Sequence, residues 1–134
     1  MLKKNRPQRA DLTIQRISSG GVFEEKIGYC RAVVAGGFVH VAGTVAGGPD
    51  VPVDVVDQCT SALEIIETTL IGAGSGLAHA VRVTYMLPDR RDFERCLPVL
   101  RAAFGANPPA ATMIECGLID PKYKIEIEVT ALMP

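Results

Sequence analysis

The sequence is poor in the features that mark several common classes of protein. It has no tryptophan, three tyrosines, four phenylalanines and two histidines among 134 residues. The 14 basic and 15 acidic residues nearly balance, so the formal charge of −1 gives a polyanion no overall attraction. The chain has few aromatic rings that could stack on bases. It also lacks a pair of neighbouring histidines, which would indicate phosphodiester cleavage. Nucleic acid is therefore not an expected partner.

Long apolar runs and closely spaced cysteines are also missing. No apolar run reaches the ~20 residues that a membrane-spanning helix needs, so we expect no membrane partner. The four cysteines, Cys30, Cys59, Cys96 and Cys116, form no CxxC pair and have no neighbouring histidine. This spacing indicates neither a metal site nor a redox centre, and we expect no cofactor. The cysteines are instead typical of free thiols in a reducing cytoplasm, where we expect the protein to act.

The length of the chain fits one domain over residues 1–134. A chain of this size buries roughly two thirds of its unfolded surface and folds without disulfides or metals. The first eleven residues, MLKKNRPQRAD, are basic and no apolar segment follows them. We interpret residues 1–11 as a flexible solvated arm rather than a signal peptide.

The first half of the chain shows strand patterns. Residues 12–17 predict a short opening strand. The segment GYCRAVVAGGFVHVAG predicts strands over residues 29–35 and 38–42, because Gly36 and Gly37 suit the positive φ angles of a tight hairpin turn. The segment from residue 43 to residue 52 is rich in glycine and proline and predicts a loop.

Two helices and another strand follow. Apolar residues recur at steps of three and four between residues 53 and 71, which predicts an amphipathic helix that Gly72 or Gly74 could end. Alternation over residues 80–87 predicts a strand. Residues 92–104 predict a second helix, bent or shortened by Pro98.

The last two predicted strands cover residues 111–118 and 123–132. The order β-β-α-β-α-β-β predicts an α+β fold in which two helices cover one face of a mixed sheet. We expect Val33, Val41 and Met113 to share the other face with charged residues. Such a face is poorly suited to bulk water, so it predicts self-association.

Five segments, in this order and spacing, resemble one known family. They are IGY at residues 27–29, GFVHVAGTVA at 37–46, LIGAGSGLAHAVRVTYMLPD at 70–89, NPPAAT at 107–112 and KIEIEV at 124–129. This pattern resembles the Rid (reactive intermediate deaminase) superfamily, also called YjgF or endoribonuclease L-PSP proteins. The resemblance implies a chorismate-mutase-like α+β fold and a homotrimer with a cleft at each subunit interface. It also implies hydrolysis of small imines and enamines such as 2-aminoacrylate.

The resemblance assigns roles to three positions. The family's water-activating glutamate falls on Glu126, and its cleft tyrosine falls on Tyr29. The arginine that holds the substrate carboxylate falls on Ala111, which has no functional group. A charged hydrogen bond contributes about 1.5–3 kcal/mol, so losing this clamp costs at least several tens-fold in binding. We therefore expect substrates that lack the carboxylate, and not a standard 2-aminoacrylate deaminase.

Other residues could shape the same site. Arg31 or Arg82 could supply a cation from another direction, although an arginine on a strand is more often solvated or paired. Met113, beside the position of the missing arginine, suggests a more apolar cleft. Glu115 shares a strand face with Ala111.

The two carboxylates leave alternatives open. Glu115 could enter the same cleft as Glu126, where each would shift the other's pKa, or it could pair with Lys124 or Arg31. Glu126 could act as a general acid and base, or it could form a salt bridge across the trimer interface.

The sequence supports three hypotheses about function. The first is a homotrimer that binds a small metabolite in clefts between subunits and hydrolyses an imine, an enamine or a related bond with help from Glu126. The second is a non-catalytic trimer that binds or senses a ligand. The third, an endoribonuclease or translation inhibitor, follows from one of the family's names and has the least support in the residues.

Overall fold

The computed structural model describes residues 13–134, so the predicted basic arm at residues 1–11 lies outside the described residues. Short 3₁₀ turns precede β4 and α3. The elements in chain order are β1 (Gln15–Ile17), α1 (Val22–Ile27), β2 (Ala32–Ala35), β3 (Phe38–Thr44), α2 (Val55–Ala73), β4 (Ala80–Leu87), α3 (Phe93–Phe104), β5 (Ala110–Glu115) and β6 (Glu126–Leu132).

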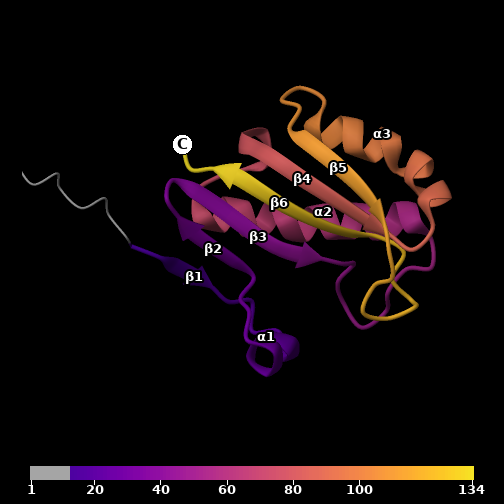
Figure 1. The fold of residues 1–134 in the computed structure, drawn as a ribbon, viewed down its shortest axis with the longest axis horizontal. Helices are drawn as coiled ribbons and strands as arrows, with labels where there is room; N and C mark the ends of the chain where they lie inside the picture. Colours follow the sequence, from indigo (N-terminus) through magenta and orange to yellow (C-terminus); the bar gives the residue numbers. More distant parts are fainter. Residues whose placement is uncertain (1–12) are drawn as a thin grey trace, which may run out of the picture.

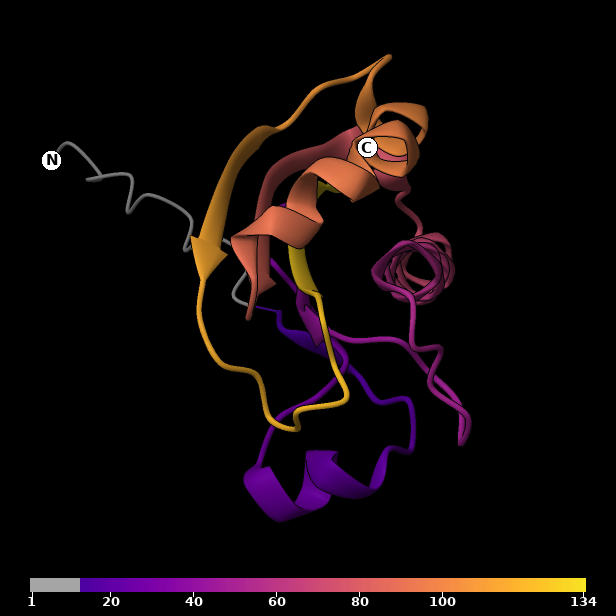
Figure 2. The same cartoon turned by 90° about the vertical axis from the view of Figure 1, so that its right-hand side faces the viewer.

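The strands form one mixed sheet in the order β1-β2-β3-β6-β4-β5 (Figure 1). Strands β4 and β5 are parallel and the other neighbours are antiparallel. Helices α2 and α3 pack on the same side of the sheet, and the opposite side is left open (Figure 2). The predicted α+β fold, with two helices over one face of a mixed sheet, is confirmed.

The turn and capping residues explain where the main elements begin and end. Gly36 and Gly37 have φ angles of 58° and 83°, so the predicted hairpin between β2 and β3 is confirmed. The side chain of Asp54 accepts a hydrogen bond from the Val56 N–H at 2.7 Å and caps the start of α2. Gly74, at φ 92°, ends that helix in the left-handed conformation.

The structure corrects the predicted elements in three places. Helix α1 was not predicted. Residues 29–31 are not part of a strand, because α1 and its left-handed cap at Gly28 delay the start of β2 to Ala32. Strands β5 and β6 are shorter than predicted, and the segment between them is correspondingly longer.

The core lies between the sheet and its two helices. Ile125, Ile127 and Val129 are at most 2% exposed, and they alternate with the more exposed Glu126 and Glu128, as predicted for the last strand. Each helix contributes its apolar stripe to the same core.

Two residues assigned to the open face were placed wrongly. Val41 pairs with the buried Ala32 and belongs to the core. Met113 pairs with Tyr85, whose ring lies 5.3 Å from that of Phe93 on α3, so Met113 is on the helix side. Side chains at paired positions share a face, and the sequence alone did not show which positions pair.

The open face carries a mixture of side chains. Val33 does lie there, opposite His40. Phe38, Ile114 and Leu132 are 37–45% exposed.

None of the helices within residues 13–134 is both long enough and apolar enough to cross a membrane.

Candidate functional site

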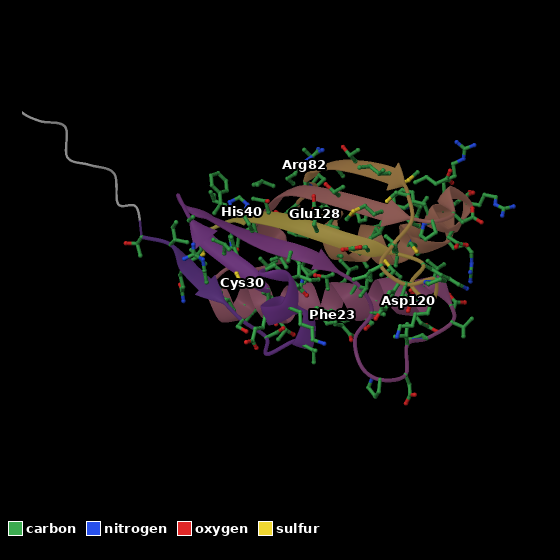
Figure 3. The ribbon with its side chains drawn as sticks, turned by 60° about the horizontal axis from the view of Figure 1, so that its bottom comes forward. Phe23, Cys30, His40, Arg82, Asp120 and Glu128 are labelled. Atoms are coloured by element: carbon green, nitrogen blue, oxygen red, sulfur yellow. The ribbon has the colours of Figure 1, made fainter. Side chains whose placement is uncertain are left out.

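A groove of about 1290 Å³ lies beside the first residue of β6. Its walls come from α1, from the end of β3 with the segment that follows, from the outer face of α2 and from the segment before β6. Figure 3 labels Phe23 of α1 and Asp120 of that last segment, which both line it. Apolar surface dominates the lining, and a few charged groups converge in it, as is usual for a small-molecule site.

Glu126 is the half-buried carboxylate of this groove. Burial raises its pKa above the ordinary value by disfavouring the charged form, and the nearby Glu128 raises it further. The positive charge of Arg31 acts in the opposite direction. A Cβ on Gly43 would collide with the Glu126 carboxylate, so only glycine leaves this space free.

Arg31 lines the same groove and is held by the end of β3. Its Nη2 donates hydrogen bonds to the carbonyl oxygens of Ala42 and Gly43, at 2.8 Å and 2.7 Å. The pairing of β3 with β6 is irregular between Val41 and Thr44. These two carbonyls lie within that irregular stretch, where a side-chain donor can take the place of a partner strand. The Arg31 Nε is buried without a hydrogen-bond acceptor.

Glu24 holds this arrangement together and was not singled out from the sequence. Its carboxylate accepts hydrogen bonds from the Ser19 hydroxyl (2.7 Å) and from the backbone N–H groups of Gly21 (2.6 Å), Arg31 (3.0 Å) and Ser19 (3.1 Å). These bonds, with that from the Ser19 side chain contributing most, lower its pKa to about 2. The carboxylate thus fixes the segment before α1 to the start of β2. An acidic residue three positions after a glycine N-cap was the signal that could have found it.

Tyr29 also lines the groove, between α1 and Arg31. Its backbone N–H donates to the carbonyl oxygen of Glu24 at 3.0 Å, and the residue is 39% exposed. The structure therefore brings Glu126 together with Tyr29 and Arg31, which are distant from it in the sequence.

Ala111, Met113 and Glu115 do not line this groove. They lie on β5, the edge strand, which β4 separates from β6. In the β4–β5 register they pair with buried residues on the helix side of the sheet, whereas Glu126 pairs with Met86 on the open side.

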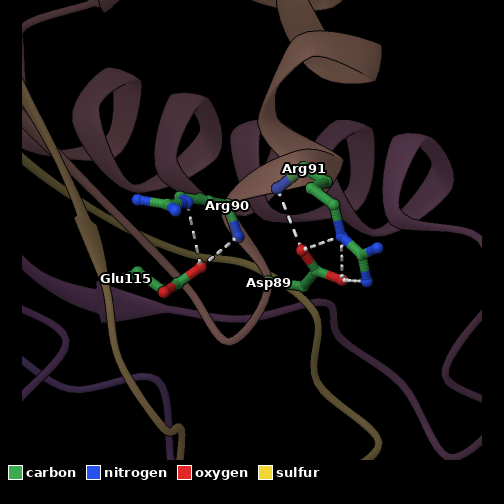
Figure 4. A network of polar contacts seen from close by, with 4 residues as sticks. All are labelled: Asp89, Arg90, Arg91 and Glu115. Atoms are coloured by element: carbon green, nitrogen blue, oxygen red, sulfur yellow. Dashed lines mark hydrogen bonds and ion pairs between the residues drawn. The ribbon is translucent and has the colours of Figure 1, made fainter.

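Glu115 therefore does not line the groove that contains Glu126 of the same chain. Its carboxylate instead accepts from the Arg90 N–H at 2.8 Å and lies 3.9 Å from the Arg90 Nε (Figure 4). Nor does it pair with Lys124 or Arg31, because β5 runs along the other edge of β4.

A second, smaller cavity of about 220 Å³ lies on the open sheet face. Figure 3 labels His40, Arg82 and Glu128 on this face. His40 hydrogen-bonds Thr130 at 3.2 Å, and Arg82 donates to the Thr112 hydroxyl at 2.7 Å. Arg82 thus lines this smaller cavity and not the larger groove of the same chain.

Comparisons with known proteins agree with this architecture. A family model described as endoribonuclease L-PSP matches residues 23–133. The RutC family protein UK114 of Drosophila melanogaster is 30% identical over 87% of each chain. The human 2-iminobutanoate/2-iminopropanoate deaminase is 26% identical over 89% of this chain and 90% of its own. The crystal structure of Rv2704, described as a YjgF/YER057c/UK114 family member from Mycobacterium tuberculosis, is 37% identical, with a TM-score of 0.81 over 90% of this chain and 99% of its own.

Proposed function

Because the chain belongs to the endoribonuclease L-PSP (YjgF/RutC/UK114) family, we propose that its groove binds a small metabolite and adds water to a C=N bond in it. The observation that carries this proposal is Glu126, a half-buried carboxylate with a raised pKa beside Arg31 and Tyr29. A carboxyl group tuned toward neutral pH can both accept and donate a proton. The name of the human relative supports an imine as the substrate class.

The reaction would proceed in two steps. Glu126 accepts a proton from a water molecule while the water oxygen bonds to the imine carbon, and it passes that proton to the imine nitrogen, which gives an aminoalcohol. Glu126 then accepts the hydroxyl proton as the carbonyl forms and the C–N bond breaks, and it delivers this proton to the departing nitrogen, so that ammonia leaves and the carboxylate is restored. Tyr29, which also lines the groove, would orient the water or the substrate nitrogen through its hydroxyl. Proton transfer of this kind contributes about 10²- to 10⁴-fold to rate.

We further propose a homotrimer in which another subunit completes each groove. The partly exposed Phe38, Ile114 and Leu132 on the open sheet face support burial of that face between copies.

The four cysteines are free thiols, which supports a reducing compartment such as the cytoplasm.

A single observation favours a non-catalytic alternative. Ala111 stands where the resemblance places the carboxylate-binding arginine, and an enzyme that lost this contact could survive as a ligand sensor.

RNA cleavage is less well supported. The charged groups that line the groove are Arg31 and Lys122 against Glu64, Asp120 and Glu126, which do not make a basic track for a phosphate backbone.

The test is ammonia release from 2-iminobutanoate generated in the assay. We expect turnover by the intact protein and a fall of about 10²- to 10⁴-fold in Glu126→Gln. Glu67→Gln removes an exposed carboxylate of α2 outside the groove and should leave turnover unchanged. Hydrolysis that Glu126→Gln leaves intact would contradict the assigned role. Binding without any turnover would favour the non-catalytic alternative.

A further inference from the structure

Arg31 forms no ion pair within residues 13–134, whereas three other arginines do. Arg90, Arg91 and Arg95 each lie within 4 Å of a carboxylate, at 3.9 Å, 2.7 Å and 2.8 Å. The Arg31 side chain contacts only neutral carbonyl oxygens and has no ion-pair partner among residues 13–134. A partly buried guanidinium with no carboxylate in direct contact is costly, and an anion from outside the chain that contacts it would stabilise it.

The donors of Arg31 are incompletely used. A guanidinium has five N–H groups, and the two carbonyls engage those of Nη2. Nε has no acceptor, and within the described chain Nη1 has none either. The backbone N–H of Arg31 is fixed by Glu24 at 3.0 Å, so the side chain starts from a rigid base. Because Nε is buried and Nη2 is engaged by the two carbonyls, Nη1 is the group of this preorganised cation that remains for a ligand in the groove.

Gly43 connects this cation to the catalytic carboxylate. Its carbonyl oxygen accepts from Arg31 at 2.7 Å, and its Cα lies against the carboxylate of Glu126. The two charges therefore flank a single residue. A small molecule that contacts one of them can contact the other.

We propose that Arg31 anchors the carboxylate of a small imino acid and presents its C=N bond to Glu126. This inference rests on the proposed function, and it assigns a substrate-binding residue in the same site. It replaces the expectation that Ala111 forces a substrate without a carboxylate, since Arg31, just before β2, provides the cation that β5 lacks. The positive charge and the two N–H groups of Nη1 suit a carboxylate, and the apolar remainder of the groove accommodates a short alkyl side chain.

The test compares an acid with an uncharged molecule of the same shape. The probes are 2-oxobutanoate and 2-oxobutanamide, titrated calorimetrically into the full-length protein. We expect the intact protein to bind the acid at least about tenfold more tightly. Arg31→Gln should weaken acid binding about tenfold to a hundredfold and change amide binding less than about twofold.

Two further variants separate recognition from general charge. Arg31→Lys keeps the charge without the planar fork and should retain part of the preference for the acid. Arg101→Gln removes an exposed arginine of α3 outside the groove and should retain all of it. Equal binding of acid and amide by the intact protein, which needs no variant, would overturn the proposal. So would an unchanged preference in folded Arg31→Gln.

The two proposals can fail separately. Preference for the acid that depends on Arg31, without ammonia release from 2-iminobutanoate, would support the anchor and contradict only the hydrolysis. Ammonia release from 2-iminobutanamide as fast as from 2-iminobutanoate would overturn the anchor and leave the hydrolysis standing.

Discussion

Gly43 and the carboxylate of Glu126 occupy adjoining space, such that a single methyl group on Gly43 would overlap the carboxylate. The same glycine accepts a hydrogen bond from Arg31 through its carbonyl oxygen. One backbone position on β3 therefore determines where both charged groups of the groove lie.

Gly43→Ala should displace the Glu126 carboxylate and reduce hydrolysis of 2-iminobutanoate. The added methyl would meet the far end of the flexible Glu126 side chain, which can move aside, so we expect little loss of stability beside the loss of turnover. Urea unfolding and the ammonia assay measure the two effects. Gly72→Ala is the matched control, because a methyl group added to this residue of α2 would meet no atom within 4 Å. It should stabilise the helix by about 0.5–1 kcal/mol with turnover unchanged. Full activity in Gly43→Ala would contradict the packing argument.

Glu126→Gln should make the folded protein more stable at pH 7. Burial and Glu128 raise the folded pKa of Glu126 above its usual 4.5, so the charged form is disfavoured in the folded state relative to the unfolded state. This cost is present above the folded pKa and disappears as the pH falls below 4.5. Thermal unfolding of both proteins between pH 4 and pH 8 should show a gap that closes in acid. Lower stability of the variant at pH 7 would instead favour a salt bridge to Glu126.

Glu24→Gln should have the opposite pH dependence. The folded pKa of Glu24 is lowered to about 2, so its carboxylate stabilises the fold above the ordinary value of 4.5 and loses that effect as the pH falls toward 2. The variant should therefore melt at a lower temperature than the intact protein at pH 7 and converge with it in acid. Glu25→Gln, an exposed neighbour on α1, should show little change. Equal melting of the two variants at pH 7 would contradict the anchoring role.

Ala111→Arg tests whether a second copy completes the groove. Within one chain, β4 separates Ala111 from Glu126, so an arginine at position 111 can reach a groove only in another subunit. We expect light scattering to give the mass of three chains. In the Arg31→Gln background, Ala111→Arg should restore part of the preference for 2-oxobutanoate over its amide. The mass of one chain, or no recovery, would count against a shared groove.

The sequence predicted the long periodic elements well and the short ones poorly. The patterns for α2, β4 and α3 agree with the structure within two residues at each end, because many positions contribute to each pattern. Helix α1 has only six residues, too few for apolar periodicity to distinguish it from a strand or a loop. What defines α1 is the capping by Gly21 and Gly28 and the hydrogen bonds of Glu24.

The resemblance to the family directed attention to Glu126 and Tyr29, and the groove contains both. The strand pattern also suggested Met113 and Glu115, which do not line the groove of the same chain. Arg31 was a weak candidate in the sequence. Its unpaired charge and its carbonyl partners are visible only in the structure.

The sequence by itself determined which residues alternate along each strand, because side-chain direction in a strand is a local property of the backbone. It placed Glu126 on the opposite face from Ile125 and Ile127 without reference to any other strand. Only the tertiary structure decided that β4 lies between β5 and β6, and that β3 holds Arg31 with two carbonyl oxygens. Strand order and register depend on the free energy of packing residues distant in the chain, and no local pattern encodes it.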